Sequence, residues 1–316
     1  MSGKSHLDSM PKSKVHFRWA LLHPRHLGSW LGLGAAFLLS LLPQQIRHRL
    51  GDWVGGYLYR YNQKRRHVVH INLRQVFPEL SERELQRKVR QHLSWYGKAL
   101  IDYSVFFFGS KRRLLRQMAI LGEAPLAKIK QQEQPVILLL AHSVMLEFAV
   151  VALSKDYNSF GSYKASANPV LDWIIARSRC RFADFVVARD EGLRPLIRAI
   201  KSQRIMIFLP DEDLGLDNAI FTPFFGRQKA TLTTPARLAK LGGAKALVGF
   251  VQFDDSLKQY QLHLRELPHS YPEEEAYTDA SSLNQTLEAL VLQCPDQYMW
   301  LMKWYKTTPE GMQKLY

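Results

Sequence analysis

Apolar residues in the second half of the chain gather into short unbroken runs, and the stretches between them carry apolar residues at helical spacing. Runs that predict buried strands span residues 136–141, 183–188 and 204–210. Segments that predict helices span residues 168–179, 191–203, 234–242 and 279–293. Continuous apolar strands between helices are typical of a mainly parallel sheet with helices on both faces. We therefore expect an α/β fold, with residues 246–253 and 260–267 forming a hairpin pair and Gly242 ending its helix.

The section between residues 52 and 119 predicts helices only. Its apolar residues recur at helical spacing, with a stop at Pro78 and a new start at Ser81. Glu84 follows that serine by three residues, which is the signature of a capping box. The pattern thus predicts a helical N-terminal region that precedes the α/β part.

Residues 27–42 form a stretch of sixteen residues without a charge. As a helix it would rise about 24 Å, which is short of the roughly 30 Å hydrocarbon core of a bilayer. Basic and aromatic residues of the kind found at membrane interfaces surround it, namely Lys12, Lys14, Arg18, Arg25, Arg47, Arg49, Trp19, Trp30 and Trp53.

We expect residues 1–50 to form an N-terminal membrane anchor, either as an interfacial helix or as a transmembrane helix, and residues 51–316 to form the main domain. The alternative is a buried core helix. Because both flanks of the apolar stretch are basic, they do not settle its orientation in a membrane.

The charge of the chain narrows the choice of partners. It has 43 Lys and Arg against 28 Asp and Glu, a net charge of +15. Such an excess favours anionic partners, which include acidic lipids, an acidic carrier protein and nucleic acid. Basic runs at residues 64–66 and 111–113 would present this charge on helical surfaces beside the predicted anchor. Nucleic acid is disfavoured, because no zinc finger or basic reading helix is visible.

Polar side chains follow two of the predicted strands. His142 comes directly after the run at 136–141, with Glu147 five residues later, and Asp211 follows the run at 204–210. Ligands of parallel sheets bind beyond the carboxyl ends of the strands, so these groups are expected at one edge. If Glu147 points back from the start of a helix, it would orient the His142 imidazole as a carboxylate does for a catalytic base. A purely structural His–Glu pair is the alternative.

The same spacing recurs at His269 and Glu274, in an acidic, proline-rich loop with no strand before it. We interpret that second occurrence as chance. Ser143 adjoins His142, but no GxSxG elbow surrounds it, so a serine nucleophile is not expected. Neither an HExxH motif nor a metal-ligand spacing of Cys180 and Cys294 is present, so we expect no metal and no cofactor.

Five ordered blocks of the chain carry a resemblance that covers most of its length. They are AHSVMLE, SYKASANPVLDWIIARSRCRF, LPDEDLG, IFTPFFGRQKATLTTPARLAKLGGA and the closing CPDQYMWLMKWYKTTPEGMQKLY. With these blocks the chain resembles the bacterial late lipid A acyltransferases, the lauroyl- and myristoyl-transfer enzymes of lipopolysaccharide assembly in the lysophospholipid acyltransferase superfamily. The resemblance implies a glycerolipid-acyltransferase-like α/β core behind an N-terminal anchor. It also implies that residues 51–316 are the acyltransferase domain.

The resemblance also implies roles for particular residues. The catalytic histidine and carboxylate of the family match His142 and Glu147. The arginine after the Asn-Pro helix best matches Arg179, with Arg181 as its neighbour, and these are expected to bind substrate or an oxyanion. The family's Asp-x-Asp matches Asp211 and Asp213, which are likewise expected to bind substrate or an oxyanion. A role of Asp211 as a helix or turn cap is equally open.

This chain departs from the family pattern at two positions. Ser143 and Leu214 stand where many members carry an aromatic residue. The first departure leaves the preference for acyl chain length or acceptor open. We have no interpretation of the second.

The family's activity would be transfer of a fatty acyl chain from acyl carrier protein to a hydroxyl of a lipid A precursor. His142 would act as general base with help from Glu147, at the cytoplasmic face of the bacterial inner membrane and in contact with its phospholipid. Two alternatives stay open. One is an acyltransferase of the same family that acts on another membrane lipid, and the other is a basic, membrane-associated binding protein without catalysis.

Overall fold

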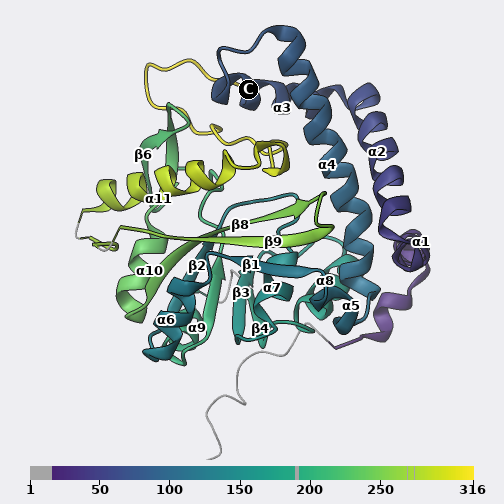
Figure 1. The fold of residues 1–316 in the computed structure, drawn as a ribbon, viewed down its shortest axis with the longest axis horizontal. Helices are drawn as coiled ribbons and strands as arrows, with labels where there is room; N and C mark the ends of the chain where they lie inside the picture. The colour runs from purple at the N-terminus through teal and green to yellow at the C-terminus, as the bar shows by residue number, and fades with distance from the viewer. Residues whose placement is uncertain (1–15, 189–191, 269, 274) are drawn as a thin grey trace, which may run out of the picture.

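The centre of the molecule is a seven-stranded sheet with the strand order β1-β9-β8-β2-β5-β3-β4. Figure 1 shows the computed structural model, which describes residues 16–188, 192–268, 270–273 and 275–316. The strands of this sheet are β1 (Met118–Leu121), β2 (Val136–Leu140), β3 (Ser159–Tyr163), β4 (Phe185–Ala188), β5 (Ile205–Phe208), β8 (Lys245–Asp254) and β9 (Gln259–Glu266). All neighbours pair in parallel except β8 and β9. The predicted mainly parallel sheet and its hairpin are confirmed.

Helices cover both faces of the sheet. The α-helices of the described residues are α1 (Leu27–Leu41), α2 (Gln44–Tyr61), α3 (Gln63–Val76), α4 (Glu82–Phe108), α5 (Lys111–Leu115), α6 (Ala124–Gln131), α7 (Phe148–Leu153), α8 (Pro169–Arg179), α9 (Leu193–Lys201), α10 (Thr234–Gly242) and α11 (Ala276–Val291). One buried apolar cluster joins one face of the sheet to α9, α10, α11 and the C-terminal segment, and a second joins the other face to α4 and α7. The sheet is therefore the middle of three layers (Figure 1).

Local sequence signals explain most of these elements. Ser81 and Glu84 form the predicted capping box at the start of α4. Asn168 caps α8 through the backbone N–H groups of residues 170 and 171, ahead of a proline in the first turn. The helix predicted over residues 234–242 is confirmed as α10. Gly242 is the last helical residue, and Gly243 takes the left-handed conformation, with φ of +60°, that ends the helix.

Four strands were not predicted. β1 is only four residues long, and β3 contains Gly161 and two serines, so neither stands out as an apolar run. The other two form a separate antiparallel hairpin, β6 (Ala219–Phe224) and β7 (Arg227–Leu232). Pro223 within the first strand and polar residues at the start of the second hid this hairpin.

Within the helical N-terminal region, α2 packs very closely on α4, and the two helices run side by side in Figure 1. Gly51 and Gly55 of α2 face Gly97 of α4. A Cβ atom on any of the three would overlap backbone atoms of the opposite helix. Glycine is therefore required at this crossing, and α2 is packed as a layer of the fold.

The apolar stretch forms α1 as predicted, but it is not a buried core helix. Leu27, Leu31 and Leu38 are each more than 60% exposed, and only Leu33 and Ser40 of this helix are buried. Within the described ranges, no helix combines the length and apolar character needed to cross a membrane. The transmembrane form of the predicted anchor is therefore not supported.

Candidate functional site

The polar groups predicted from the strand ends do meet at one edge of the sheet. β2 and β5 are parallel neighbours, with Leu139 opposite Phe208. Their carboxyl ends deliver His142 and Asp211 to the same place, although 69 positions separate these residues in sequence. The sheet topology thus creates a pair that the chain order does not suggest.

Asp211 holds His142 at two points. Its Oδ2 accepts a hydrogen bond from the His142 backbone N–H at 2.9 Å, and its Oδ1 lies 2.5 Å from the imidazole Nδ1. The Asp211 side chain is fully buried, and the imidazole packs beside the Trp304 ring. With Nδ1 bonded to a carboxylate, the ring carries its proton on Nδ1 and presents Nε2 as the free acceptor. No described residue forms a hydrogen bond with that Nε2.

The predicted pairing of His142 with Glu147 is wrong. Residues 144–147 form turns, and Glu147 stands at the N-cap of α7, where both of its carboxylate oxygens accept hydrogen bonds from Arg179. The place beside the imidazole Nδ1 is taken by Asp211 from the neighbouring strand. Proximity in sequence misled the prediction, because the partner of His142 comes from across the sheet.

Glu147 and Arg179 form a bidentate ion pair, with the Arg179 Nε 2.8 Å from Oε2. Burial would lower the pKa of the Arg179 guanidinium, but the Glu147 carboxylate raises it above its usual value. Both side chains line a cavity of about 60 Å³ whose other walls are almost entirely apolar. That lining includes Leu140 and Leu209, each two positions before His142 and Asp211 respectively. The ion pair therefore lines an apolar pocket, and the strands that carry His142 and Asp211 supply two of its other walls.

Asp211 has two further neighbours. The Tyr298 hydroxyl donates to its Oδ2 at 2.8 Å. Burial disfavours the carboxylate, but His142 and the nearby Lys229 hold the pKa of Asp211 below its usual value. Burial in turn lowers the pKa of Lys229 to about 8, against the opposing effect of Asp211 and Asp213. The Lys229 ammonium is fully buried, and no described residue forms a hydrogen bond with it.

The other two predicted site residues make contacts of a different kind. Arg181 donates to the backbone carbonyls of Phe106, Phe107 and Gly109 and so caps the end of α4. Asp213 accepts from the Thr307 backbone N–H at 2.6 Å and from its hydroxyl at 2.7 Å, which fastens the C-terminal segment. Neither side chain forms a hydrogen bond with His142 or Glu147 in the described part of the chain.

Ser143 is fully buried and its hydroxyl is occupied. It donates to the Val251 carbonyl and accepts from the Met145 backbone N–H. This placement agrees with the expectation that Ser143 is not a nucleophile. Within the described residues, no three His, Cys, Asp or Glu side chains are grouped so that they could hold a metal ion. The second sequence match, His269 with Glu274, lies outside the described residues.

Sequence reasoning missed Tyr298 and Lys229. Tyr298 lies in the aromatic C-terminal block, and its ring stacks on Trp304 with ring centroids 4.8 Å apart. Lys229 lies in the hairpin that was not predicted. Lys229 stands between Gln228 and Ala230 in the motif QKATL, and this sequence gives no sign that the lysine is buried.

The comparisons with known proteins agree on one family. The profile of the family described as bacterial lipid A biosynthesis acyltransferase matches residues 14–307. The chain is 32% identical to a lipid A biosynthesis lauroyltransferase of Escherichia coli over 98% of this chain and all of that protein. It is 26% identical to a lipid A biosynthesis myristoyltransferase of the same organism, over 98% of this chain and 94% of the relative. It is also 26% identical to a palmitoleoyltransferase of E. coli, over 95% and 98% of the two chains.

Proposed function

This chain belongs to the bacterial lipid A biosynthesis acyltransferase family and is a lipid A biosynthesis acyltransferase, and from that premise we propose that it moves a fatty acyl chain from acyl carrier protein to a hydroxyl of a lipid A precursor. The family implies the lipid A precursor as acceptor. The thioester of acyl carrier protein is the donor in this proposal, and no cofactor takes part.

His142 is the general base, positioned by Asp211. An alcohol is a poor nucleophile at neutral pH, and a positioned base typically contributes about 10²–10⁴-fold to the rate. The carboxylate on Nδ1 directs the free Nε2 toward the acceptor hydroxyl and stabilises the imidazolium that forms. The contacts of 2.9 Å and 2.5 Å between these two residues are the observation that carries the proposal.

The reaction balances without a covalent enzyme intermediate. The acceptor oxygen attacks the thioester carbonyl while its proton passes to Nε2 of His142. The tetrahedral intermediate then collapses with cleavage of the carbon–sulfur bond, and the departing thiolate takes the proton from the imidazolium. The products are the acylated lipid and the free thiol of the carrier.

Glu147 and Arg179 serve the acyl group in this proposal. The guanidinium stabilises the oxyanion of the tetrahedral intermediate, and the Glu147 carboxylate fixes its orientation by the bidentate contact. The apolar cavity beside this pair receives the methylene groups next to the thioester carbonyl. Glu147 therefore assists catalysis through Arg179, and not through the His142 imidazole as the sequence pattern predicted. Arg181 and Asp213 keep the neighbouring backbone in place.

The enzyme works at the cytoplasmic face of the bacterial inner membrane, with α1 lying in the membrane interface. The exposed leucines of α1 supply the apolar contact that this location requires. A boundary between anchor and acyltransferase domain after residue 50 falls inside α2, which packs closely on α4. We therefore place the end of the anchor at Pro43, between α1 and α2.

Mass spectrometry of lipid A tests the acceptor. Cells that lack this gene should accumulate lipid A one or more acyl chains short, and the His142→Ala variant should not restore the missing chain. Normal lipid A together with a change in another membrane lipid would favour the family member with a different acceptor. Lipid binding without any acyl transfer in purified protein would favour the non-catalytic alternative.

A further inference from the structure

A basic pocket lies on the short segment that follows α4. It is a hollow of about 290 Å³, lined by Ser110, Arg112, Arg113, Arg116 and Gln117. We call it the arginine pocket. It lies outside the His142 site, and neither the proposed catalysis nor the family pattern uses it.

The charges of the arginine pocket are not balanced by the protein. In the described ranges, no carboxylate forms an ion pair with any of its three arginines. Arg112 and Arg116 stand four positions apart at α5, a spacing at which like charges repel each other and destabilise a helix. A segment that retains this repulsion is suited to an anion that comes from outside the protein.

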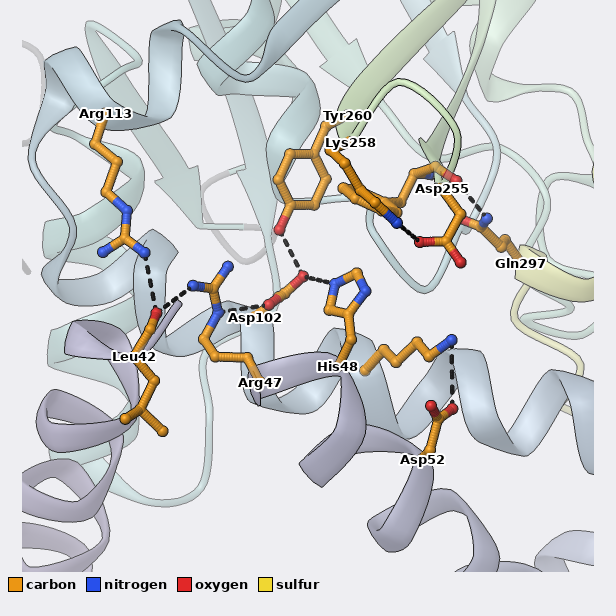
Figure 2. Close-up of polar contacts among 12 residues, drawn as sticks. Leu42, Arg47, His48, Asp52, Asp102, Arg113, Asp255, Lys258, Tyr260 and Gln297 are labelled. Atoms are coloured by element: carbon orange, nitrogen blue, oxygen red, sulfur yellow. Dashed lines mark hydrogen bonds and ion pairs between the residues drawn. The ribbon is translucent and has the colours of Figure 1, made fainter. Parts of the chain in front are cut away.

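Hydrogen bonds attach the arginine pocket to the end of α1. Arg113 donates from Nη1 to the Ser40 carbonyl at 2.7 Å and from Nη2 to the Leu42 carbonyl at 3.2 Å. Figure 2 shows Arg47 reaching the same Leu42 carbonyl from the other side, at 2.8 Å. Burial lowers the pKa of Arg113, and the charge of Arg47 lowers it further. Arg47 is paired with Asp102, whereas the described residues give Arg113 no carboxylate partner, so the charge at this end of α1 comes from the arginine pocket.

Exposed apolar side chains adjoin this positive region. Phe37, Leu38 and Leu41 stand on the last two turns of α1, and all three are exposed to solvent. Leu41 directly follows Ser40 and precedes Leu42, the two residues that Arg113 holds. A cationic hollow and an apolar helix surface thus share one boundary on the molecule.

We propose that the arginine pocket binds the phosphate headgroup of an anionic membrane phospholipid, while the exposed side chains of α1 lie among the acyl chains of the same leaflet. A lipid matches both features at once, because its phosphate meets the guanidinium groups and its hydrocarbon meets Phe37, Leu38 and Leu41. An acidic carrier protein would match the charges only. The inference rests on the proposed membrane location of the enzyme and is independent of its catalytic mechanism.

Vesicle flotation with the full-length protein tests the proposal. One set of vesicles contains phosphatidylcholine alone, and the other contains added phosphatidylglycerol. The double variant Arg112→Gln/Arg116→Gln should lose about 30-fold in affinity for the anionic vesicles, which corresponds to about 1 kcal/mol for each basic residue. Its affinity for neutral vesicles should not change, because the apolar surface of α1 is intact.

The chain offers a matched control in α9. Arg194 and Arg198 are exposed, have the same spacing of four positions, and lie on a different helix. Arg194→Gln/Arg198→Gln removes the same charge and should change anionic vesicle binding by less than about threefold, as expected for charges screened at this distance. Equal losses in the two double variants would mean that net charge alone attracts the membrane, and would overturn the proposed pocket.

Two further measurements keep the test decisive. Arg112→Lys/Arg116→Lys preserves the charge and should retain most of the anionic binding. A loss as large as that of the glutamine variant would contradict an electrostatic site. Binding of purified acyl carrier protein is measured on the same variants. If it weakens while vesicle binding persists, the pocket belongs to the carrier and the lipid proposal fails.

The vesicle experiment also distinguishes a failure of the arginine pocket from a failure of the proposed membrane location. Wild-type protein that binds neutral and anionic vesicles equally would refute the arginine pocket and leave the interfacial α1 intact. Wild-type protein that binds neither would refute both. Acyl transfer to acceptor dispersed in detergent would still test the catalytic proposal in either case.

Discussion

Two buried aspartates in this chain bind nearly the same set of side chains. Asp211 contacts the His142 imidazole and the Tyr298 hydroxyl, and Asp102 contacts the His48 imidazole at 2.8 Å and the Tyr260 hydroxyl at 2.6 Å. Figure 2 shows the second group, in which Asp102 on α4 is approached from α2 and from β9. A His–Asp–Tyr constellation is therefore not by itself evidence of a catalytic site.

The surroundings of the two aspartates distinguish them. Asp102 connects α2, α4 and β9, and the His48 ring packs against Phe253, with centroids 4.8 Å apart. Asp211 lies beyond the carboxyl ends of two parallel strands, two positions after Leu209, which lines the same apolar pocket as Glu147 and Arg179. The Asp102 group is therefore expected to stabilise the fold, and the Asp211 group to serve the reaction.

The cation beside each aspartate also differs. Arg47 donates from Nε to Asp102 at 2.8 Å, and a guanidinium keeps its charge at any pH used in practice. Lys229 is the cation near Asp211, and burial brings its pKa to about 8. The Asp102 group thus holds a permanent charge, and the Asp211 group holds one that can be lost.

The Asp211 group and the Asp102 group should differ most when the histidine of each is replaced. His142→Ala should lower kcat by about 10²–10⁴-fold because a base is lost, and it should also destabilise the fold, since a buried Asp211 oxygen loses its partner. His48→Ala should leave kcat near normal and lower the free energy of unfolding by about 1–3 kcal/mol, because the Asp102 oxygen loses a buried partner. Transfer assays and thermal melts of both variants check this. A comparable loss of kcat in His48→Ala would remove the distinction.

Removing the charge of Asp102 should affect stability more than any other single change in its group. Both Arg47 and Asp102 are completely buried. Asp102→Asn leaves the guanidinium without a counter-charge, and breaking a buried pair in this way typically costs about 3–5 kcal/mol. Chemical denaturation measures the loss, and the folded fraction should retain its kcat. Unchanged stability would show that Arg47 finds another partner.

These contrasts also show what the sequence could and could not reveal. His142 and Asp211 were placed at one edge because each follows an apolar strand, and that placement held. Their contact was missed because it depends on β2 and β5 being neighbours, which chain order does not determine. Glu147 was chosen instead, because it is close in sequence.

The sequence pattern gives even less indication of the Asp102 group. Asp102 lies on a long amphipathic helix, where an acidic residue is ordinarily expected to face solvent. Its burial results from α2 and β9 covering the same turn of α4, a tertiary arrangement that no local pattern encodes. Helices, strands and caps follow from local periodicity, but buried polar networks depend on which elements become neighbours.

Variants of the Glu147–Arg179 pair should show a loss of kcat of intermediate size. Glu147→Gln keeps the shape of the side chain and removes its charge, so we expect normal folding and a loss in kcat of up to about 10²–10³-fold, the amount that one lost oxyanion contact typically costs. Arg179→Ala should lower kcat at least as much. If the two residues act as a unit, the double variant should be no worse than Arg179→Ala alone. Additive losses would show that Glu147 has a role of its own.

The smallest expected effect is a pH dependence that only the Asp211 group should have. Burial lowers the pKa of Lys229 from 10.5 to about 8, so between these values the unfolded chain holds more protons than the folded one. Stability should therefore rise with pH in this window, by at most about 1.4 kcal/mol per pH unit. Lys229→Met should lack this rise, whereas Arg47→Met should keep it. Denaturation of the three proteins between pH 8 and 9.5 isolates the lysine, because their other titrating groups are shared. Parallel curves for wild type and Lys229→Met would mean that the ammonium keeps its proton beside Asp211, and the proposed difference between the two cations would be lost.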